Sequence, residues 1–128
     1  IYIQMRSSFM GLKKILLVDD DPTILEFMSD IFEDVDCEVY FAHNGLEATQ
    51  LLKHHHFQVV VSDIVMPVMT GIELTEKING ETPLILTSGF ENNLDPQLHW
   101  NTYIDKMDLG TGLLKATEKA IQRHSLGF

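Results

Sequence analysis

Two apolar runs that end on carboxylates constrain the fold of this chain more than any other feature. Ile15–Val18 leads directly into the acidic run Asp19–Asp21, and Val59–Val61 leads into Asp63 after a single serine. An uninterrupted β-branched run is typical of a strand that is buried on both faces of a sheet. Open α/β sheets place their chemistry beyond the carboxyl ends of their strands. If these two strands are parallel neighbours, the sequence predicts that both acidic groups lie at one edge of the sheet.

The rest of the chain alternates between strand-like and helix-like segments. Asp21 before Pro22 is a strong signal for the start of a helix, because aspartate caps helices and proline fits their first position. The expected strands are 13–18, 37–41, 57–62, 83–87 and 102–104, and the expected helices are 22–34, 46–54, 71–79 and 113–123. Strands that alternate with helices pair in parallel through right-handed crossovers. The sequence therefore predicts an α/β fold: a doubly wound five-stranded parallel sheet of order 2-1-3-4-5, flavodoxin-like, in which Pro96 leaves the fourth helix short or irregular.

Length and charge restrict the domain organisation and the partners. The chain has 128 residues, enough for one domain, which we expect over 12–126, and we interpret 1–11 as an N-terminal extension or tag remnant. The net charge of −10 argues against nucleic-acid binding by this domain and leaves room for cations. No stretch approaches the roughly 20 apolar residues of a membrane span. The lone Cys37 suits a reducing compartment, so we expect a cytoplasmic protein.

The acidic residues at the predicted sheet edge indicate a metal site. Three carboxylates in one pocket repel one another unless a cation is present. Mg²⁺ is the best candidate, with Mn²⁺ as a substitute, because hard divalent ions prefer oxygen ligands. The run at 19–21 also has a simpler interpretation, as a helix cap with first-turn acids that suit the helix dipole. Asp21 fits that interpretation, whereas the second strand-end acid, Asp63, favours the metal interpretation for Asp19 and Asp20.

A hydroxyl and an ammonium follow two further strands. Ser88 ends the fourth predicted strand and could donate a hydrogen bond to a phosphoryl oxygen, although Ser88-Gly89 is also a common turn signal. Lys106 follows the fifth predicted strand and could pair with Asp63 or with a phosphoryl oxygen, but on its own it is equally consistent with a surface lysine. The histidine run 54–56 is interpreted as a solvated helix end, because adjacent residues of a helix point in different directions.

Together these residues resemble the receiver domain of two-component response regulators. The resemblance covers 13–124, in family order, and its motifs are Asp19-Asp20, Asp63 with Met66-Pro67 and Gly71, Ser88-Gly89, and Lys106. It implies a receiver-like fold and a phosphoacceptor signalling switch in a two-component phosphorelay. It also implies that the domain is no enzyme beyond self-catalysed phosphotransfer and autodephosphorylation.

The resemblance assigns the phosphoacceptor and the metal ligands. Asp63 would attack a phosphohistidine and form an acyl phosphate. Asp20 and Asp63 would ligate Mg²⁺ directly, together with the backbone carbonyl of Val65, and Asp19 would act mostly through a water.

The resemblance also assigns the remaining roles and the partners. Ser88 and Lys106 would hold the phosphoryl oxygens, and Tyr103 would turn inward with Ser88 as the switch. Thr87 competes with Ser88 for the hydroxyl role. The implied partners are a histidine kinase or phosphotransfer protein, a downstream protein or fused output domain, and a second copy of the domain in a weak homodimer.

Two departures from the family pattern keep alternatives open. Met107 stands where the family usually has proline after its lysine, and the segment between Ser88 and Lys106 is short. Both motivate the alternative of a receiver-like interaction module that is not phosphorylated, whereas the intact set of acidic residues argues against it. A second alternative is a haloacid-dehalogenase-like phosphatase, from the pattern Asp19-x-Asp21-x-Thr23, but this interpretation leaves Asp63 and its neighbours unexplained.

Overall fold

The computed structural model describes residues 13–78, 80–89 and 102–127, and they contain a five-stranded parallel sheet. The spatial order is β2-β1-β3-β4-β5, with every neighbouring pair parallel. The strands are β1 (Lys13–Val18), β2 (Cys37–Ala42), β3 (Val59–Asp63), β4 (Leu84–Ser88) and β5 (Thr102–Asp105). The predicted fold class and strand order are confirmed.

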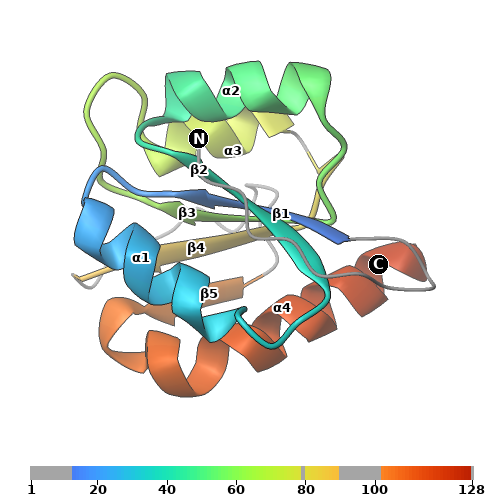
Figure 1. Cartoon of the computed structure of the whole chain (residues 1–128). Helices are drawn as coiled ribbons and strands as arrows, with labels where there is room; N and C mark the ends of the chain where they lie inside the picture. The colour runs from blue at the N-terminus through green and yellow to red at the C-terminus, as the bar shows by residue number, and fades with distance from the viewer. Residues whose placement is uncertain (1–12, 79, 90–101, 128) are drawn as a thin grey trace.

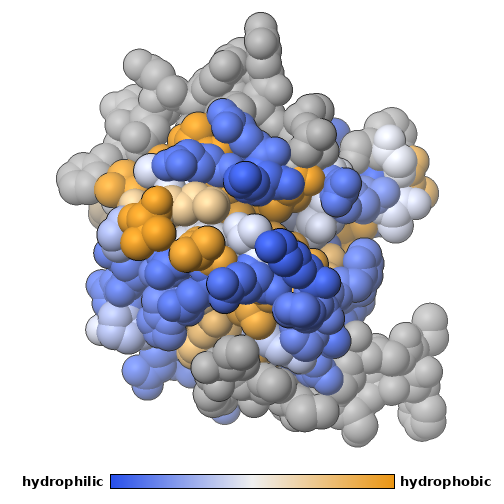
Figure 2. Space-filling model, turned by 90° about the horizontal axis from the view of Figure 1, so that it is seen from above, coloured by the Kyte–Doolittle hydropathy of each residue, from blue (hydrophilic) through white to orange (hydrophobic). Residues whose placement is uncertain are grey.

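Helices cover both faces of this sheet (Figure 1). Helices α2 (Gly45–His54) and α3 (Gly71–Ile78) lie on one face, and α1 (Pro22–Ile31) and α4 (Leu109–Ser125) lie on the other. A short 3₁₀ turn, η1 (Lys106–Asp108), joins β5 to α4. No helix in the described ranges has the length and apolar character that crossing a bilayer requires. Seen from above in Figure 2, the molecule presents mostly hydrophilic side chains with smaller hydrophobic areas between them.

The buried side chains form two clusters, one on each face of the sheet. Alternate residues of a strand point to opposite faces, so Leu17 and Val61 join the cluster under α1 and α4, while Leu16 and Val60 join the cluster under α2 and α3. All five residues of β3 and all five of β4 are buried. This double-sided burial is why these strands are continuous apolar runs in the sequence.

Two helix starts follow the general capping rules, and the sequence predicted the first of them. The Asp21 side chain accepts the backbone N–H of Thr23 at 2.9 Å, and Pro22 occupies the first position of α1. The Asn44 side chain accepts the N–H of Glu47 at 2.8 Å and starts α2. Because Asp21 caps α1, the chain turns sharply after Asp19 and Asp20 and keeps them at the edge of the sheet.

Several predicted boundaries were wrong. Helix α1 ends at Ile31 and not near residue 34, because the Phe32 N–H bonds the Ser29 carbonyl and closes the last turn. Helix α4 begins at Leu109 and not at residue 113, because Leu109 is buried to 1% exposure and this packing outweighs the poor helix propensity of the glycines that follow it. The predicted extension 1–11 and the short fourth-helix region around Pro96 lie outside the described residues.

Candidate acidic site at the carboxyl edge of the sheet

Three carboxylates meet where β1 and β3 end. Val18 pairs with Ser62, so the next residues along the two strands, Asp19 and Asp63, lie side by side. One carboxylate oxygen from each of Asp19, Asp20 and Asp63 lies within 4.8 Å of the others. Asp19 is fully buried and Asp63 is 4% exposed, whereas Asp20 faces the solvent. The structure therefore brings together the acids that the sequence placed at one edge.

Lys106 bridges the two buried acids. Its Nζ lies 2.9 Å from Asp19 Oδ2 and 3.0 Å from Asp63 Oδ2. Burial alone would lower the pKa of Lys106, but its hydrogen bonds to Asp19 and Asp63 outweigh burial, so the pKa is raised. Lys106 is thus a fixed counter-ion of this site and not an ordinary surface lysine.

The charge of the buried Asp19 carboxylate is only partly compensated by its neighbours. Burial is the largest influence and raises the pKa of Asp19, and the nearby Asp63 charge acts in the same direction. The Asp21 N–H, which donates to Asp19 Oδ1 at 2.9 Å, and the Lys106 ammonium lower the pKa without cancelling the effect of burial. A buried carboxylate whose charge is only partly compensated gains from a second cation.

The acidic group fits a hard divalent cation. It offers carboxylate oxygens from three side chains, one of them open to solvent, and Mg²⁺ typically takes one or two carboxylates while keeping several waters. Within the described ranges it is the one group of three or more histidine, cysteine or acidic residues whose ligand atoms lie so close together. The residues at this edge therefore fit a divalent cation in number, atom type and spacing.

The loop after β3 holds the Asp63 carboxylate. The Val65 N–H donates to Asp63 Oδ1 at 3.3 Å, and the Ile64 N–H donates to the Thr87 carbonyl at 2.9 Å. The left-handed residue of this loop is Val68, with a φ of 70°, and Gly71 is the first residue of α3.

Gly71 instead allows α3 to touch the backbone of Asp63. A Cβ atom at this position would overlap the Asp63 carbonyl oxygen and lie 2.8 Å from the Ile64 Cα. Real Cβ contacts are essentially never this short, so the helix would have to move. The Gly71 N–H also donates to the Ile64 carbonyl at 2.9 Å, which fixes the start of α3 against the end of β3.

We expect Gly71→Ala to lower the free energy of unfolding by about 2 kcal/mol, because the added methyl group overpacks a rigid backbone contact. Urea unfolding followed by circular dichroism measures the change. Gly112→Ala is the matched control: a Cβ there meets nothing within 4 Å, and alanine is the better helix former, so stability should rise slightly. Equal stability of the Gly71 variant and the natural chain would contradict the close contact.

Ser88 and Thr87 lie on opposite faces of β4. Thr87 pairs with Asp63, and strand alternation puts it on the face of α1 and α4, as it does Ile85. Ser88 is 1% exposed, pairs with Asp105, and shares the other face with Tyr103, which packs against the cluster under α2 and α3. The location of Ser88 and Tyr103 on one face of the sheet is consistent with the switch roles that the sequence suggested for them.

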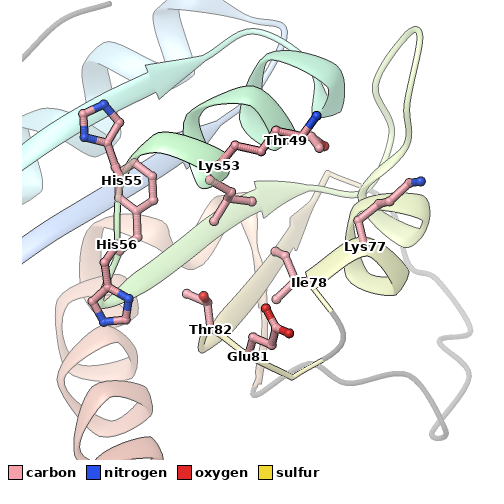
Figure 3. A pocket seen from close by; sticks show the side chains of 10 residues that line it. Thr49, Lys53, His55, His56, Lys77, Ile78, Glu81 and Thr82 are labelled. Atoms are coloured by element: carbon pink, nitrogen blue, oxygen red, sulfur yellow. The ribbon is translucent and has the colours of Figure 1, made fainter.

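A second concavity lies at the opposite edge of the sheet, between the ends of α2 and α3 (Figure 3). It has a volume of about 420 Å³, and none of the predicted site residues lines it. His55 and His56 point away from each other in Figure 3, and the His55 ring packs 4.7 Å from the Tyr40 ring. The histidine run is therefore no shared metal site, although His55 is less solvated than the sequence suggested.

Comparison with known proteins points to one family. Residues 15–106 match the family model described as response regulator receiver domain. The "Uncharacterized 14.6 kDa protein in sodA1 3'region" of Leptolyngbya boryana is 35% identical over 72% of this chain and 77% of its own length. The "Probable transcriptional regulator ycf29" of Pyropia yezoensis is 37% identical over 51% of this chain. This chain spans 29%, 31% and 40% of the length of three curated regulators that it matches.

The solved structures agree with this match. The response regulator protein TrrA from Thermotoga maritima, solved in complex with Mg²⁺ and BeF, superposes with a TM-score of 0.77 at 25% sequence identity. The match covers 85% of this chain and 99% of that one.

Proposed function

This chain belongs to the response regulator receiver domain family, and on that premise we propose that Asp63 is its phosphoacceptor. The observation that carries the proposal is the Lys106 ammonium, which lies between Asp63 and Asp19. It holds one Asp63 oxygen in place at the mouth of a loop, beside two further carboxylates. A structural ion pair would need neither the exposed Asp20 nor the open edge of the sheet.

We propose that phosphotransfer begins with attack by a carboxylate oxygen of Asp63 on the phosphorus of a partner's phosphohistidine. An O–P bond forms, the N–P bond breaks, and the electron pair returns to the imidazole nitrogen, which leaves an acyl phosphate on Asp63. A Mg²⁺ ion held by Asp20, Asp63 and the Val65 carbonyl, with Asp19 acting through a water, would neutralise charge on the phosphoryl oxygens.

The chain's own groups then hold the product. Lys106 is near enough to Asp63 to pair with a phosphoryl oxygen, and Ser88, at the end of β4, supplies a hydroxyl. The common face of Ser88 and Tyr103 supports a switch in which Tyr103 moves inward as Ser88 is drawn toward the phosphoryl group. A switch of this kind shifts the population of two conformations of one surface.

We propose a histidine kinase or phosphotransfer protein as the phosphodonor, and a downstream protein or fused output domain as the receiver of the signal. The buried Cys37 thiol suits the cytoplasm as the place of action. The phosphatase alternative is poorly supported, because its nucleophile would be Asp19, which is fully buried and bonded to Lys106 and to the Asp21 N–H.

Incubation with acetyl phosphate, with and without Mg²⁺, followed by intact-mass measurement, tests the phosphoacceptor. We expect one phosphoryl addition that requires Mg²⁺ and is lost in Asp63→Asn, because the amide cannot act as the nucleophile. Asp30→Asn on the exposed surface of α1 is the control and should still accept the group. An acyl phosphate retained in Asp63→Asn would contradict the assignment, and no addition to the natural chain would favour the unphosphorylated interaction module.

A further inference from the structure

Thr87 carries a buried hydroxyl beside the acidic site. Its side chain is 0% exposed, and its Oγ1 has no hydrogen-bond partner among the residues that the structure describes. A buried hydroxyl without a partner is destabilising, and valine would fill the same volume without that cost. The position of Thr87 next to the acidic site suggests what the hydroxyl is for.

Thr87 lies in the same row as the reactive groups. It pairs with Asp63 on one side and with Ile104 on the other, and all three side chains share the face of α1 and α4. Neighbouring strands lie roughly 4.8 Å apart, so the Thr87 hydroxyl is within one side chain's reach of the Asp63 carboxylate.

The Lys106 side chain passes the end of β4, the strand of Thr87, to reach Asp63 and Asp19. It follows β5, and its two acids follow β3 and β1, so its side chain passes the carboxyl end of β4, where Thr87 lies. An ammonium has three N–H donors: one donates to Asp63 Oδ2 at 3.0 Å, while Asp19 Oδ2, 2.9 Å from Nζ, is held as an ion pair. A threonine oxygen can accept the hydrogen bond that a third donor, or a released one, offers.

We propose that Thr87 is a positioning residue for Lys106: its hydroxyl oxygen accepts an ammonium N–H when, in the cation-loaded site, Lys106 gives up its ion pair with Asp19. This inference rests on the proposed function, since it concerns the cation-loaded site. This role accounts for a buried hydroxyl in the row formed by Asp63, Thr87 and Ile104. In the loaded site Thr87 keeps Lys106 directed at Asp63.

Calorimetric titration with MgCl₂ tests the inference on four proteins: the natural chain, Thr87→Val, Thr87→Ser and Thr117→Val. We expect Thr87→Val to weaken Mg²⁺ binding about five-fold, because the loaded state loses one hydrogen bond. Thr87→Ser should restore the affinity. Thr117→Val is the matched control, since Thr117 on α4 is 2% exposed and its Oγ1 also has no partner among the described residues. Both valine variants should have a melting temperature equal to or above that of the natural chain. A loss of Mg²⁺ affinity would therefore not reflect unfolding.

A second titration tests whether the effect of Thr87 on Mg²⁺ affinity depends on Lys106. In a Lys106→Met background, Thr87→Val should leave Mg²⁺ affinity unchanged, because the hydroxyl no longer has an ammonium to hold. If Thr87→Val still weakens Mg²⁺ binding five-fold in the Lys106→Met background, the inference is overturned. It is also overturned if the single variant Thr87→Val binds Mg²⁺ as tightly as the natural chain. If the natural chain binds no Mg²⁺, the proposed function fails as well. If the natural chain binds Mg²⁺ and the Thr87→Val variant binds it with the same affinity, only the proposed role of Thr87 fails.

Discussion

Lys106→Met is expected to destabilise the metal-free protein by about 3 kcal/mol, because it leaves the buried Asp19 carboxylate without its cation. Methionine keeps most of the aliphatic stem, so the loss reports on charge more than on packing. Addition of Mg²⁺ should recover most of the stability, since the ion replaces the missing ammonium beside Asp19 and Asp63. The variant should also bind Mg²⁺ more tightly than the natural chain, because no ammonium competes for the carboxylate oxygens.

Urea unfolding with and without MgCl₂ measures both effects of Lys106→Met. Lys115→Met, at an exposed position of α4, is the matched control and should change neither the stability nor its dependence on Mg²⁺. The Lys106 contribution depends on pH with a definite sign. Its pKa is raised by folding, so the stabilisation is fully present below about 10.5 and is lost as pH rises through the higher folded value. A Lys106→Met protein as stable as the natural chain without Mg²⁺ would refute the counter-ion role.

Asp19→Asn is expected to stabilise the metal-free protein by about 1 kcal/mol while greatly weakening Mg²⁺ binding. The substitution removes a buried charge that repels Asp63, and Lys106 keeps Asp63 as a partner. The same change takes one carboxylate from the only three-residue acidic group found within the described residues. Stability and metal binding should therefore move in opposite directions, which a general folding defect could not produce.

The pH dependence of Asp19→Asn provides the check. Folding raises the pKa of Asp19, so the folded state holds a proton that the unfolded state has already lost, and the natural chain loses stability as pH rises from about 3.8 through the folded value. The stability advantage of the Asp19→Asn variant over the natural chain should thus be largest at neutral pH and disappear in acid. Unfolding curves over this pH range, with Asp30→Asn as a surface control, measure the difference. An advantage that stays constant with pH would contradict the burial of a charged Asp19.

The sheet and its acidic edge could be predicted because their signals are local and periodic. Val59–Val61 is buried on both faces, and such runs are distinctive in sequence. Asp21 before Pro22 marked the start of α1 to the residue. The alternation of strands and helices indicated a strand order in which β1 and β3 are neighbours. The proximity of Asp19 and Asp63 followed from that order.

The features that could not be predicted from the sequence depend on contacts between segments that are distant in the chain. Helix α4 starts four residues early because Leu109 packs into the core, and no local rule places a helix start before two glycines. The role of Gly71 is a close contact with the Asp63 carbonyl, and no local sequence pattern shows that contact. Lys106 alone could not be told from a surface lysine, because its partners are more than forty positions away and come close only in the folded sheet.

The contact between Gly71 and the Asp63 carbonyl also tells a protein engineer where this site can be altered. The helix and the strand already touch at Gly71, so α3 cannot be moved closer to the Asp63 backbone. Val65 and Val68, in the same loop, are 57% and 73% exposed and contribute little to the core. Libraries aimed at the lifetime of a phosphorylated state should therefore vary these two side chains and keep the glycine, so that kinetics can be tuned while the scaffold stays the same.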